Sequence, residues 1–493
     1  MKIMLVVPNA RKWPLTIPGV EVVSARKYIT EPVFSRLSGV RVFNLCHVHR
    51  YQSTGYYVSL LAEARQHKPV PNITTLRDLQ TPAMIRMTHA ELQELIQKSL
   101  DSIKSDRFTL SVYFGKNLAK RYDRLSRELF NRFHAHFLRA EFIRTNKTWT
   151  LQNVNTISIQ EVPDGHHRFV EKVAGQYFAG AGYRNRKRQF SRYSLAILHR
   201  PDEVNAPSNA RALKKFVRAG QKQGLDVELI TKDDFGRIAE FDALFLRETT
   251  SAADYTFRFA RYAEANGCVV IDDAQSIVRC ANKVYLSEML AHGRIRTPRT
   301  MIVHKDNVDL VVHEIGLPCV LKQPDSSFSA GVKRATTAEE LQSYAQMMLD
   351  RSELIIAQEF LPTEFDWRVG VLNDRALYAC RYYMARGHWQ IIHRDSHGRQ
   401  REGRGDTLPL DQVPAAAVKL ALKATRPIGR GLYGVDIKQV RDRFYVIEVN
   451  DNPNIDAGVE DKIRGDALYA EVMQVFLTRI EASKAISQRT SLS

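Results

Sequence analysis

The polar residues with the clearest chemical use lie near the C-terminus, in the segment YGVDIKQVRDRFYVIEVNDNPN. Its two apolar runs and the turn-like RDR predict a pair of strands. Asp436 lies on the first strand, and Glu448 and Asn450, two residues apart, share one side of the second. Carboxylates in an apolar sheet need a partner charge or a metal, and two carboxylates with an amide oxygen suit Mg²⁺ bound beside nucleotide phosphates. The alternative is a strand with one polar face in solvent.

Two lysines upstream of this hairpin lie where phosphate groups could bind. Lys283 opens the amphipathic pattern NKVYLSEMLAHG, which predicts a helix ending at Gly293. Lys322 ends the apolar strand of LPCVLK and is followed by the small residues of QPDSSFSAGV. The backbone amides of such a loop could hold phosphate oxygens. Neither lysine is specific by itself.

A chain reversal is expected in LIIAQEFLPTEFDWRVGVL. The first strand ends at Glu359 and Phe360, the chain turns at Pro362, and a second strand follows with Asp366 and Arg368. Carboxylates therefore lie next to the reversal.

Taken in order, these pieces resemble the ATP-grasp superfamily over residues 272–482. The resemblance implies that two lysines contact the phosphates and that the loop of residues 326–331 closes over them. It also implies that the chain reversal is a hinge and that adenine binds there. Glu359 and the Leu361 backbone would meet the adenine edge, and Glu364 the ribose. The residues implied to bind ATP are Lys283, Lys322, Ser326, Ser327, Ser329, Gly331, Gln358, Glu359, Phe360, Leu361 and Glu364. The loop carries only Gly331, where many relatives have more glycines.

The same resemblance assigns the metal and substrate residues. Asp436, Glu448 and Asn450 would hold Mg²⁺, with two ions expected and Mn²⁺ as a substitute. Within the superfamily, the segments DWRVGVL, YGVDIKQV, VIEVNDNPN and LFLRETTS are similar to RimK-type glutamate ligases. This likeness implies catalytic roles for Arg368 and Arg381 and substrate contacts for Arg247 and Asn454. A surface or ion-pairing role is the alternative for each arginine.

The rest of the chain predicts two further α/β regions, so the expected fold class is α/β with a C-terminal α+β ATP-grasp domain. Residues 1–182 alternate β-type runs with helical patterns. Residues 183–278 begin with the basic run YRNRKRQFSR, read as a linker, and continue as a small pre-ATP-grasp unit of pattern β-α-β-β-α with CVVID as a closing strand. The ATP-grasp domain is expected over residues 279–484, with a tail at 485–493.

The N-terminal region is similar to that of longer RimK-like proteins through LCHVHRYQSTGYYVSLLAEARQHK, but its role is not evident from its residues. Ser53, Thr54 and Gly55 at a helix start could bind an anion or form an ordinary cap. His47 and His49 alternate on an expected strand without a third metal ligand.

Composition and charge limit the classes of protein to which the chain can belong. The chain has 493 residues, of which 44% are hydrophobic and 26% charged, as in soluble globular proteins. Its net charge of +18 attracts polyanions such as ATP, acidic substrates and RNA. Five scattered cysteines predict neither disulfides nor a zinc site and favour the cytoplasm. The apolar run at residues 3–7 is too short for a signal or a membrane span and reads as a first strand. We also expect a homo-oligomer.

Together these features predict an ATP-dependent carboxylate–amine ligase that forms an acylphosphate and releases ADP and phosphate. Its substrates would be an amino-acid or peptide carboxylate and an amine on a small molecule, peptide or protein, with glutamate a candidate. The segment RGHWQIIHRDSHGRQREGR at residues 386–404 could cover the anionic reaction centre, bind an acidic substrate, or be a solvated hairpin. Its histidines, His388, His393 and His397, are candidate bases. The alternatives are an RNA- or ribosome-binding protein with a regulatory ATP site, and ATP-grasp chemistry with a product other than an amide.

Overall fold

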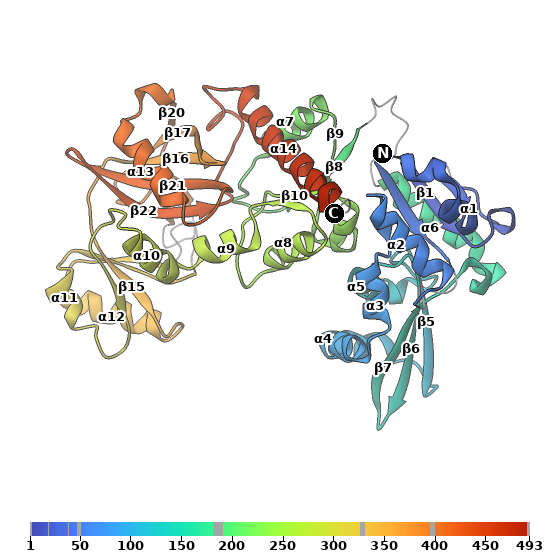
Figure 1. The fold of residues 1–493 in the computed structure, drawn as a ribbon. Helices are drawn as coiled ribbons and strands as arrows, with labels where there is room; N and C mark the ends of the chain where they lie inside the picture. Colours follow the sequence, from blue (N-terminus) through green and yellow to red (C-terminus); the bar gives the residue numbers. More distant parts are fainter. Residues whose placement is uncertain are drawn as a thin grey trace. The chain divides into compact units, whose positions relative to one another are not determined.

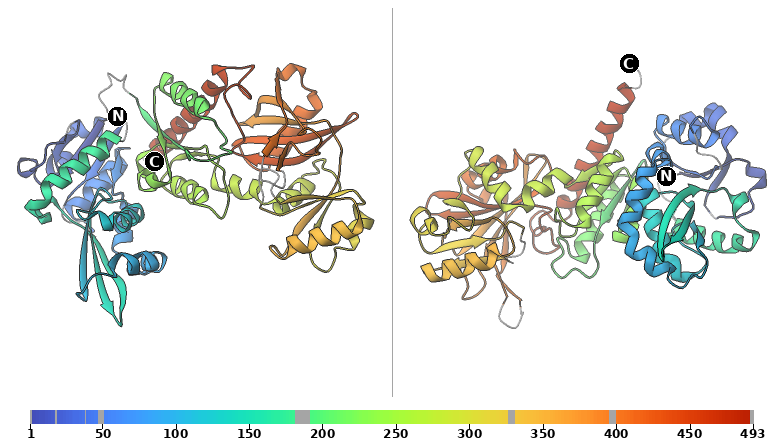
Figure 2. Two further views of the ribbon diagram at one scale, coloured as in Figure 1. Left: turned by 180° about the vertical axis from the view of Figure 1, so that it is seen from behind. Right: turned by 90° about the horizontal axis from the view of Figure 1, so that it is seen from below.

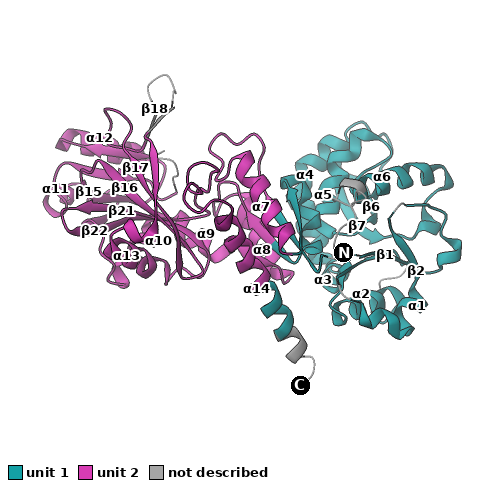
Figure 3. Cartoon of the chain, turned by 90° about the horizontal axis from the view of Figure 1, so that it is seen from above, with its two compact units in different colours: residues 1–196, 224–243, 480–493 teal, residues 197–223, 244–479 magenta. Residues whose placement is uncertain are grey.

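The computed structural model describes residues 2–17, 19–37, 39–46, 51–180, 191–325, 331–394 and 400–490. The chain divides into two compact units, which Figure 3 colours separately. Unit 1 comprises Met1–Ala196, Gly224–Ala243 and Ile480–Ser493, and unit 2 comprises Ile197–Gln223 and Leu244–Arg479. Both contain helices and sheets, so the expected α/β class is confirmed. None of the helices within the described residues is long and apolar enough to cross a membrane.

Unit 1 contains a parallel sheet and an antiparallel one. The parallel sheet, in the order β2-β1-β3-β4, is formed by β1 (Lys2–Val7), β2 (Glu21–Ser24), β3 (Val40–Asn44) and β4 (Lys68–Val70). The antiparallel sheet is formed by β5 (Arg107–Tyr113), β6 (Phe137–Thr145) and β7 (Thr148–Thr156). The helices are α1 (Ala25–Thr30), α2 (Thr54–Ala64), α3 (Ile73–Leu79), α4 (Pro82–Leu100), α5 (Asp123–Phe133) and α6 (His167–Gly180). Figures 1 and 2 show these elements in blue to blue-green.

Two expectations for unit 1 can be compared with this structure. The run at residues 3–7 is a buried strand, as expected for the centre of a sheet. Ser53 caps α2, because its Oγ accepts a hydrogen bond from the Tyr56 amide at 3.2 Å. His47 and His49 lie outside the described residues, as does most of the basic run at residues 183–192.

The small sheet that follows has the expected element order. It contains β8 (Tyr193–Leu198), α7 (Ala210–Lys222), β9 (Leu225–Ile230), β10 (Ala243–Leu246), α8 (Tyr255–Ala265) and β11 (Val269–Ile271), with strand order β11-β10-β8-β9. The C-terminal helix α14 (Asp466–Thr490) packs on this region. Its Tyr469 ring lies 4.7 Å from that of Phe216, and its Phe476 ring lies 5.3 Å from that of Phe245. The expected tail at 485–493 therefore begins inside α14; the other expected domain boundaries stay predictions.

The remainder of unit 2 is built on two antiparallel sheets. The first, in the order β12-β15-β13-β14, is formed by β12 (Thr300–Val303), β13 (Cys319–Lys322), β14 (Val332–Ala335) and β15 (Ile355–Glu359). The second, in the order β20-β17-β16-β21-β22, is formed by β16 (Phe365–Leu372), β17 (Arg375–Tyr383), β20 (Gly405–Leu408), β21 (Leu432–Val440) and β22 (Arg443–Asp451). A short pair is formed by β18 (Ile392–Arg394) and β19 (Gln400–Glu402). The helices are α9 (Ala274–Ala281), α10 (Lys283–His292), α11 (Leu310–Glu314), α12 (Ala338–Leu349) and α13 (Ala415–Thr425).

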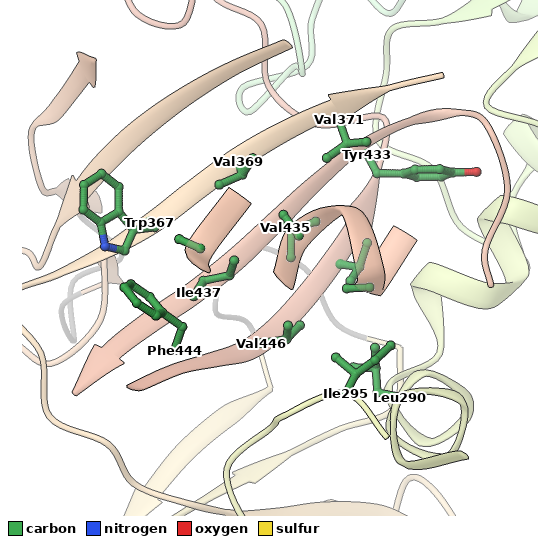
Figure 4. Packing of buried hydrophobic residues seen from close by; sticks show 14 of the residues in the cluster. Leu290, Ile295, Trp367, Val369, Val371, Tyr433, Val435, Ile437, Phe444 and Val446 are labelled. Carbon is green, nitrogen blue, oxygen red and sulfur yellow. The ribbon is translucent and has the colours of Figure 1, made fainter. Parts of the chain in front are cut away.

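The five-stranded sheet has one apolar face and one polar face. On the apolar face, Trp367, Val369, Val435 and Val446 lie in one buried cluster, as Figure 4 shows. Alanines of α13 belong to the same cluster. Because side chains alternate along a strand, the residues between them point to the other face. This alternation presents the polar residues of β16, β21 and β22 together.

The expected hairpin of β21 and β22 forms with Asp436 directly opposite Glu448. A bulge follows Asp436, so the register changes at the point where the carboxylates lie. Gly434 is required beside them: a Cβ at this position would lie 2.7 Å from the Pro453 side chain. The small residue lets the loop after β22 approach the sheet closely.

Candidate active site

A cavity of about 690 Å³ lies between the two antiparallel sheets of unit 2. Its volume is in the range of sites for small molecules. Residues of both sheets, of the start of α10 and of the loop after β22 line it. The lining residues that the sequence had singled out are Lys283, Lys322, Gln358, Glu359, Phe360, Leu361, Arg368, Asp436, Glu448, Asn450 and Asn454.

Two buried lysines form the positive part of this lining. Lys322, at the end of β13, is 9% exposed, and its Nζ donates to Gln358 Oε1 at 2.8 Å. Lys283 is 8% exposed, and its Nζ lies 2.9 Å from Glu448 Oε1. Burial disfavours the ammonium form and lowers the pKa of Lys322 to about 8. A phosphate group beside Lys322 would restore the charged form.

Lys283 is positioned by the junction of α10 with the chain after β13. The Asn282 side chain caps α10 by accepting from the Val284 and Tyr285 amides, both at 3.0 Å. The Lys283 amide donates to the Pro324 carbonyl at 3.0 Å. These contacts place Lys283 next to the start of the loop that the sequence predicts to hold phosphates.

The carboxylates of the hairpin are paired with cations of the chain. Arg368 binds Asp436 through two nitrogens, with Nη2 at 2.7 Å from Oδ2, and Asn450 Nδ2 donates to the same oxygen at 3.2 Å. Burial raises the pKa of Asp436, although Arg368 acts in the opposite direction. Burial also works to raise the pKa of Glu448, but Lys283 and nearby positive charge hold it below its ordinary value.

This set of side chains fits a complex of Mg²⁺ and polyphosphate. Asp436, Glu448 and Asn450 offer oxygen ligands on one face of the sheet, and their partners Arg368 and Lys283 offer donors to phosphate. In such a complex, Mg²⁺ would replace Arg368 and Lys283 as the positive partner of the carboxylates. Phosphate would replace the carboxylates as the negative partner of Arg368 and Lys283. In the described ranges no three His, Cys, Asp or Glu side chains gather as a metal site, so a metal bound here would need the amide of Asn450 as a further ligand.

The expected hinge lines the cavity as well. Gln358 Nε2 donates to Thr300 Oγ1 at 3.0 Å, so its amide links Thr300 to Lys322. Glu359 Oε2 instead accepts from the Arg299 amide at 3.2 Å. Its carboxylate is therefore engaged with Arg299, the residue before β12, and Phe360 and Leu361 line the cavity beside it.

The other five implied ATP contacts are placed less directly. Glu364 is exposed and is not part of the cavity lining. Gly331 has a φ of +70°, which favours glycine, and its carbonyl accepts from the Gln323 amide at 2.9 Å. The loop positions Ser326, Ser327 and Ser329 lie outside the described residues, and so do the side chains of His393 and His397.

Arg381 lies on the face of the sheet away from the cavity, which corrects its expected placement. Its guanidinium carbon is 4.8 Å from the ring centre of Trp367 and 5.0 Å from that of Phe365. The next residue on the strand, Tyr382, lines the cavity. The structure therefore brings Arg368, but not Arg381, to the carboxylates.

Arg247 is fully buried beneath the cavity and is not in its lining. Its Nη1 donates to Asn452 Oδ1 at 2.6 Å and its Nη2 to the Pro453 carbonyl at 2.9 Å. Its Nε and Nη2 both donate to Ser208 Oγ, at 3.0 and 2.9 Å, and Nη2 also donates to the carbonyl of Pro207 at 2.5 Å. These bonds attach the loop after β22 to the chain before α7.

The buried carboxylate of Asp272 supports the same loop. Its Oδ2 accepts from the Asn452 amide at 2.8 Å, and its Oδ1 accepts from the Leu432 amide at 2.6 Å. The loop that carries Asn454 is thus held by two buried side chains, those of Arg247 and Asp272.

Several lining residues were not expected from the sequence. Asp451 is the last residue of β22, and Asp456 and Glu460 follow the hairpin; all three line the cavity. Thr250 donates to Asp451 at 2.6 Å, and Tyr382 donates to Glu460. The run DNPNIDAGVED, with four acids directly after the metal-type hairpin, is the signal that could have pointed to them.

Two family models match the chain. The RimK-like ATPgrasp N-terminal domain matches residues 25–173, and the RimK-like ATP-grasp domain matches residues 280–472. The chain belongs to the RimK-like ATP-grasp ligases. The second match spans the lysines, the hinge and the hairpin that line the cavity.

Similar proteins carry ligase names. A probable alpha-L-glutamate ligase of Vibrio vulnificus is 26% identical over 233 residues, which are 46% of this chain and 74% of that protein. The alpha-aminoadipate–LysW ligase LysX of Sulfolobus acidocaldarius is 27% identical over 256 residues, or 49% of this chain and 88% of that one. The RimK domain ATP-grasp structure from Sphaerobacter thermophilus covers 57% of this chain and 98% of its own, at 17% identity and a TM-score of 0.43.

Membership of the RimK-like ATP-grasp ligases gives the general activity. These enzymes use ATP with Mg²⁺ to form a carbon–nitrogen bond between a carboxylate and an amine. The chain is therefore an ATP-dependent ligase with the expected N-terminal RimK-like domain.

Proposed function

We propose that the protein activates a carboxylate as an acylphosphate, joins it to an amine, and releases ADP and phosphate. The observation that carries this proposal is the charge arrangement of one cavity: the buried lysines Lys283 and Lys322 lie with the carboxylates Asp436 and Glu448 around the same space. Such an arrangement favours the binding of a nucleoside triphosphate with Mg²⁺.

In the first step, a carboxylate oxygen attacks the γ-phosphorus of ATP, and ADP leaves with the bonding electron pair. Lys283, Lys322 and Arg368 would stabilise the negative charge on the transferring group, because donors fixed in a buried site need little reorganisation. Bound by Asp436, Glu448 and Asn450, one or two Mg²⁺ ions would neutralise phosphate charge and align the reacting oxygens.

In the second step, the amine nitrogen attacks the acyl carbon and phosphate leaves. The amine arrives as an ammonium ion at neutral pH and must lose protons. Asp451, Asp456 and Glu460 line the cavity, and Arg247 is close enough to act electrostatically on Asp456 and Glu460 without lining the cavity itself. Three acids at the surface of the cavity favour a substrate with positive charge at its amine. An amino acid has this property, and the names of the glutamate ligase relatives make glutamate the first amino acid to test.

The direct test is a product screen. Purified protein is incubated with ATP, Mg²⁺, each amino acid and a set of peptide or small-molecule acceptors, and nucleotides and new masses are measured together. We expect ADP and phosphate in equal amounts, with a product whose mass is the sum of the acid and the amine less one water. AMP and pyrophosphate would contradict the proposal, and hydroxylamine should trap the acylphosphate as a hydroxamate.

A pair of lysine variants distinguishes the loss of a cation from the cavity from the loss of one positive charge elsewhere on the protein. Lys322→Met removes a buried cation from the cavity, whereas Lys305→Met removes an exposed one elsewhere in unit 2. The proposal requires that only the first variant loses ATP-dependent product. Equal activities would show that the buried lysine does not serve the nucleotide.

A further inference from the structure

The net positive charge of the chain is concentrated in unit 1. The residues of this unit include 35 Lys and Arg against 21 Asp and Glu, which is a net charge of +14. Unit 2 has 37 against 33 and carries the remaining +4. The cavity proposed to bind ATP is lined by residues of unit 2, so that nucleotide does not account for the charge of unit 1. An excess of this size on one unit favours a polyanionic partner.

Unit 1 also exposes neighbouring aromatic side chains at and just before the start of α2. Tyr51 is 60% exposed and Tyr57 is 40% exposed. The ring centres of Tyr51 and Tyr56 lie 5.2 Å apart, and those of Tyr56 and Tyr57 lie 5.8 Å apart. We call these three residues the tyrosine cluster. A continuous apolar surface that is open to solvent is typical of an interaction site.

A cation lies against the tyrosine cluster. The guanidinium carbon of Arg77, in α3, is 5.4 Å from the ring centre of Tyr51, which is a cation–π contact. The helices α2 and α3 lie side by side in unit 1 (Figures 1 and 3). Arg77 is exposed, so its guanidinium can contact a phosphate as well as the ring.

Aromatic rings beside a cation, on a positively charged unit, suit a single strand of nucleic acid. Its bases stack on the rings, and its phosphates pair with the cations. A duplex keeps its base faces inside the helix, so exposed rings add little to its binding. RNA presents unpaired bases in loops, bulges and ends, and proteins stack such bases on tyrosine rings and arginine planes.

We propose that the tyrosine cluster and Arg77 bind single-stranded RNA, with bases stacked on Tyr51 and Tyr57 and a phosphate paired with Arg77. This role is separate from the proposed ligation, because it uses a surface of unit 1 and requires neither ATP nor a carboxylate substrate.

Binding of a fluorescent oligo(U) of about 12 nucleotides to the full chain tests the stacking, followed by anisotropy without ATP. We expect Tyr51→Ala and Tyr57→Ala each to weaken binding about 10-fold, and Tyr51→Phe to bind like wild type because it keeps the ring. Tyr285→Ala is the matched control and should bind like wild type, since Tyr285 is 43% exposed but lies on α10 of unit 2. Thermal unfolding checks that each variant folds.

The salt dependence of the same binding tests the cation. Arg77→Met should weaken binding and reduce the slope of log affinity against log salt by about 0.7, the value for one phosphate contact with a single strand. The tyrosine variants should keep the slope of wild type. Arg218→Met removes an exposed arginine from α7 of unit 2 and should change neither the affinity nor the slope.

Several results would overturn the assignment to single-stranded RNA. One is equal affinity of wild type, Tyr51→Ala and Tyr57→Ala for oligo(U). Another is tighter binding of duplex RNA or of oligo(dT) than of oligo(U) by wild type. If the same variants weaken the binding of polyglutamate as much as that of oligo(U), the surface takes an acidic polypeptide instead.

The ligase assay separates this inference from the proposed reaction. The tyrosine and Arg77 variants should form amide at the rate of wild type with small-molecule substrates. Loss of oligo(U) binding in variants that keep this rate supports the RNA surface. If no acceptor yields an amide but oligo(U) binding depends on Tyr51 and Tyr57, the RNA surface stands and the proposed reaction fails.

Discussion

Replacement of Arg247 by methionine tests whether the buried network beneath the cavity supports the loop after β22. The side chain of Arg247 has no exposed surface. It donates to four acceptors: Ser208 Oγ, Asn452 Oδ1 and the carbonyls of Pro207 and Pro453. Methionine has similar length but no donor, so all four acceptors would be left without this partner inside the protein.

The expected change in the free energy of unfolding is the balance of two opposing contributions. A hydrogen bond from a charged donor contributes about 1.5–3 kcal/mol, so four lost bonds cost at least about 6 kcal/mol. Burial of the charge is itself unfavourable and lowers the pKa of Arg247 from 12.5 to about 10, which corresponds to about 3 kcal/mol recovered when the charge is removed. We therefore expect Arg247→Met to reduce the free energy of unfolding by roughly 3 kcal/mol or more.

Urea unfolding followed by circular dichroism measures this loss. Arg218→Met is the matched control, because Arg218 is exposed on α7, and it should cost less than about 1 kcal/mol. A different result would refute the supporting role: Arg247→Met as stable as wild type, with a raised KM for the carboxylate or amine. Arg247 would then contact substrate, as the sequence resemblance implies.

Three further substitutions test other parts of the structure. Lys322→Met should raise the KM for ATP by about 10-fold or more at an unchanged melting temperature, because a buried donor to phosphate is lost; steady-state kinetics decide. Glu448→Gln should lower Mg²⁺-dependent turnover by about 100-fold or more, and unchanged activity would remove Glu448 from the metal site. Glu248 is buried with Oε1 unpaired, and burial raises its pKa from 4.5 to about 7. The fold thus favours the protonated form, and stability falls as the pH rises from about 4.5 to 7. Glu248→Gln should increase the unfolding free energy by up to about 3 kcal/mol at about pH 8 and leave it unchanged at about pH 4, as melting across pH would show.

The sequence predicted the structure best where polar residues of clear chemical use lie within a regular pattern of apolar residues. Asp436 and Glu448 could be placed on paired strands because apolar residues alternate around them and a turn separates the two runs. The small sheet before the cavity could be predicted for the same reason, since its strands and helices have distinct periods.

Arg381 shows why a side chain's face was harder to predict. The turn at Asn373 and Asp374, both with positive φ, fixes the start of the hairpin of β16 and β17. Counting from this turn without a bulge pairs Arg381 with Asp366, on the cavity face. The structure has a bulge beyond Gly370, which pairs Arg381 with Trp367 and reverses its direction.

Contacts between residues far apart in the sequence could not be predicted either. Arg247 reaches Asn452 across 205 positions in the sequence, and no local pattern marks such a pair. Trp389 likewise packs on Phe360 because a turn is folded back onto the hinge, whereas the spacing of its neighbours resembles that of a solvated loop. The homo-oligomer stays a prediction, and so does a weak contact with nucleic acid or the ribosome, which the net charge of +18 would favour.

In the proposed reaction, the carboxylate is activated by the γ-phosphoryl group of ATP. This activation can be tested most directly with a substrate whose carboxylate is labelled with oxygen-18, once the product screen has identified one. Mass spectrometry of the released phosphate and nucleotide follows the label. We expect one labelled oxygen in inorganic phosphate for each amide formed, with unlabelled ADP. Label in AMP, or none in phosphate during amide formation, would contradict it.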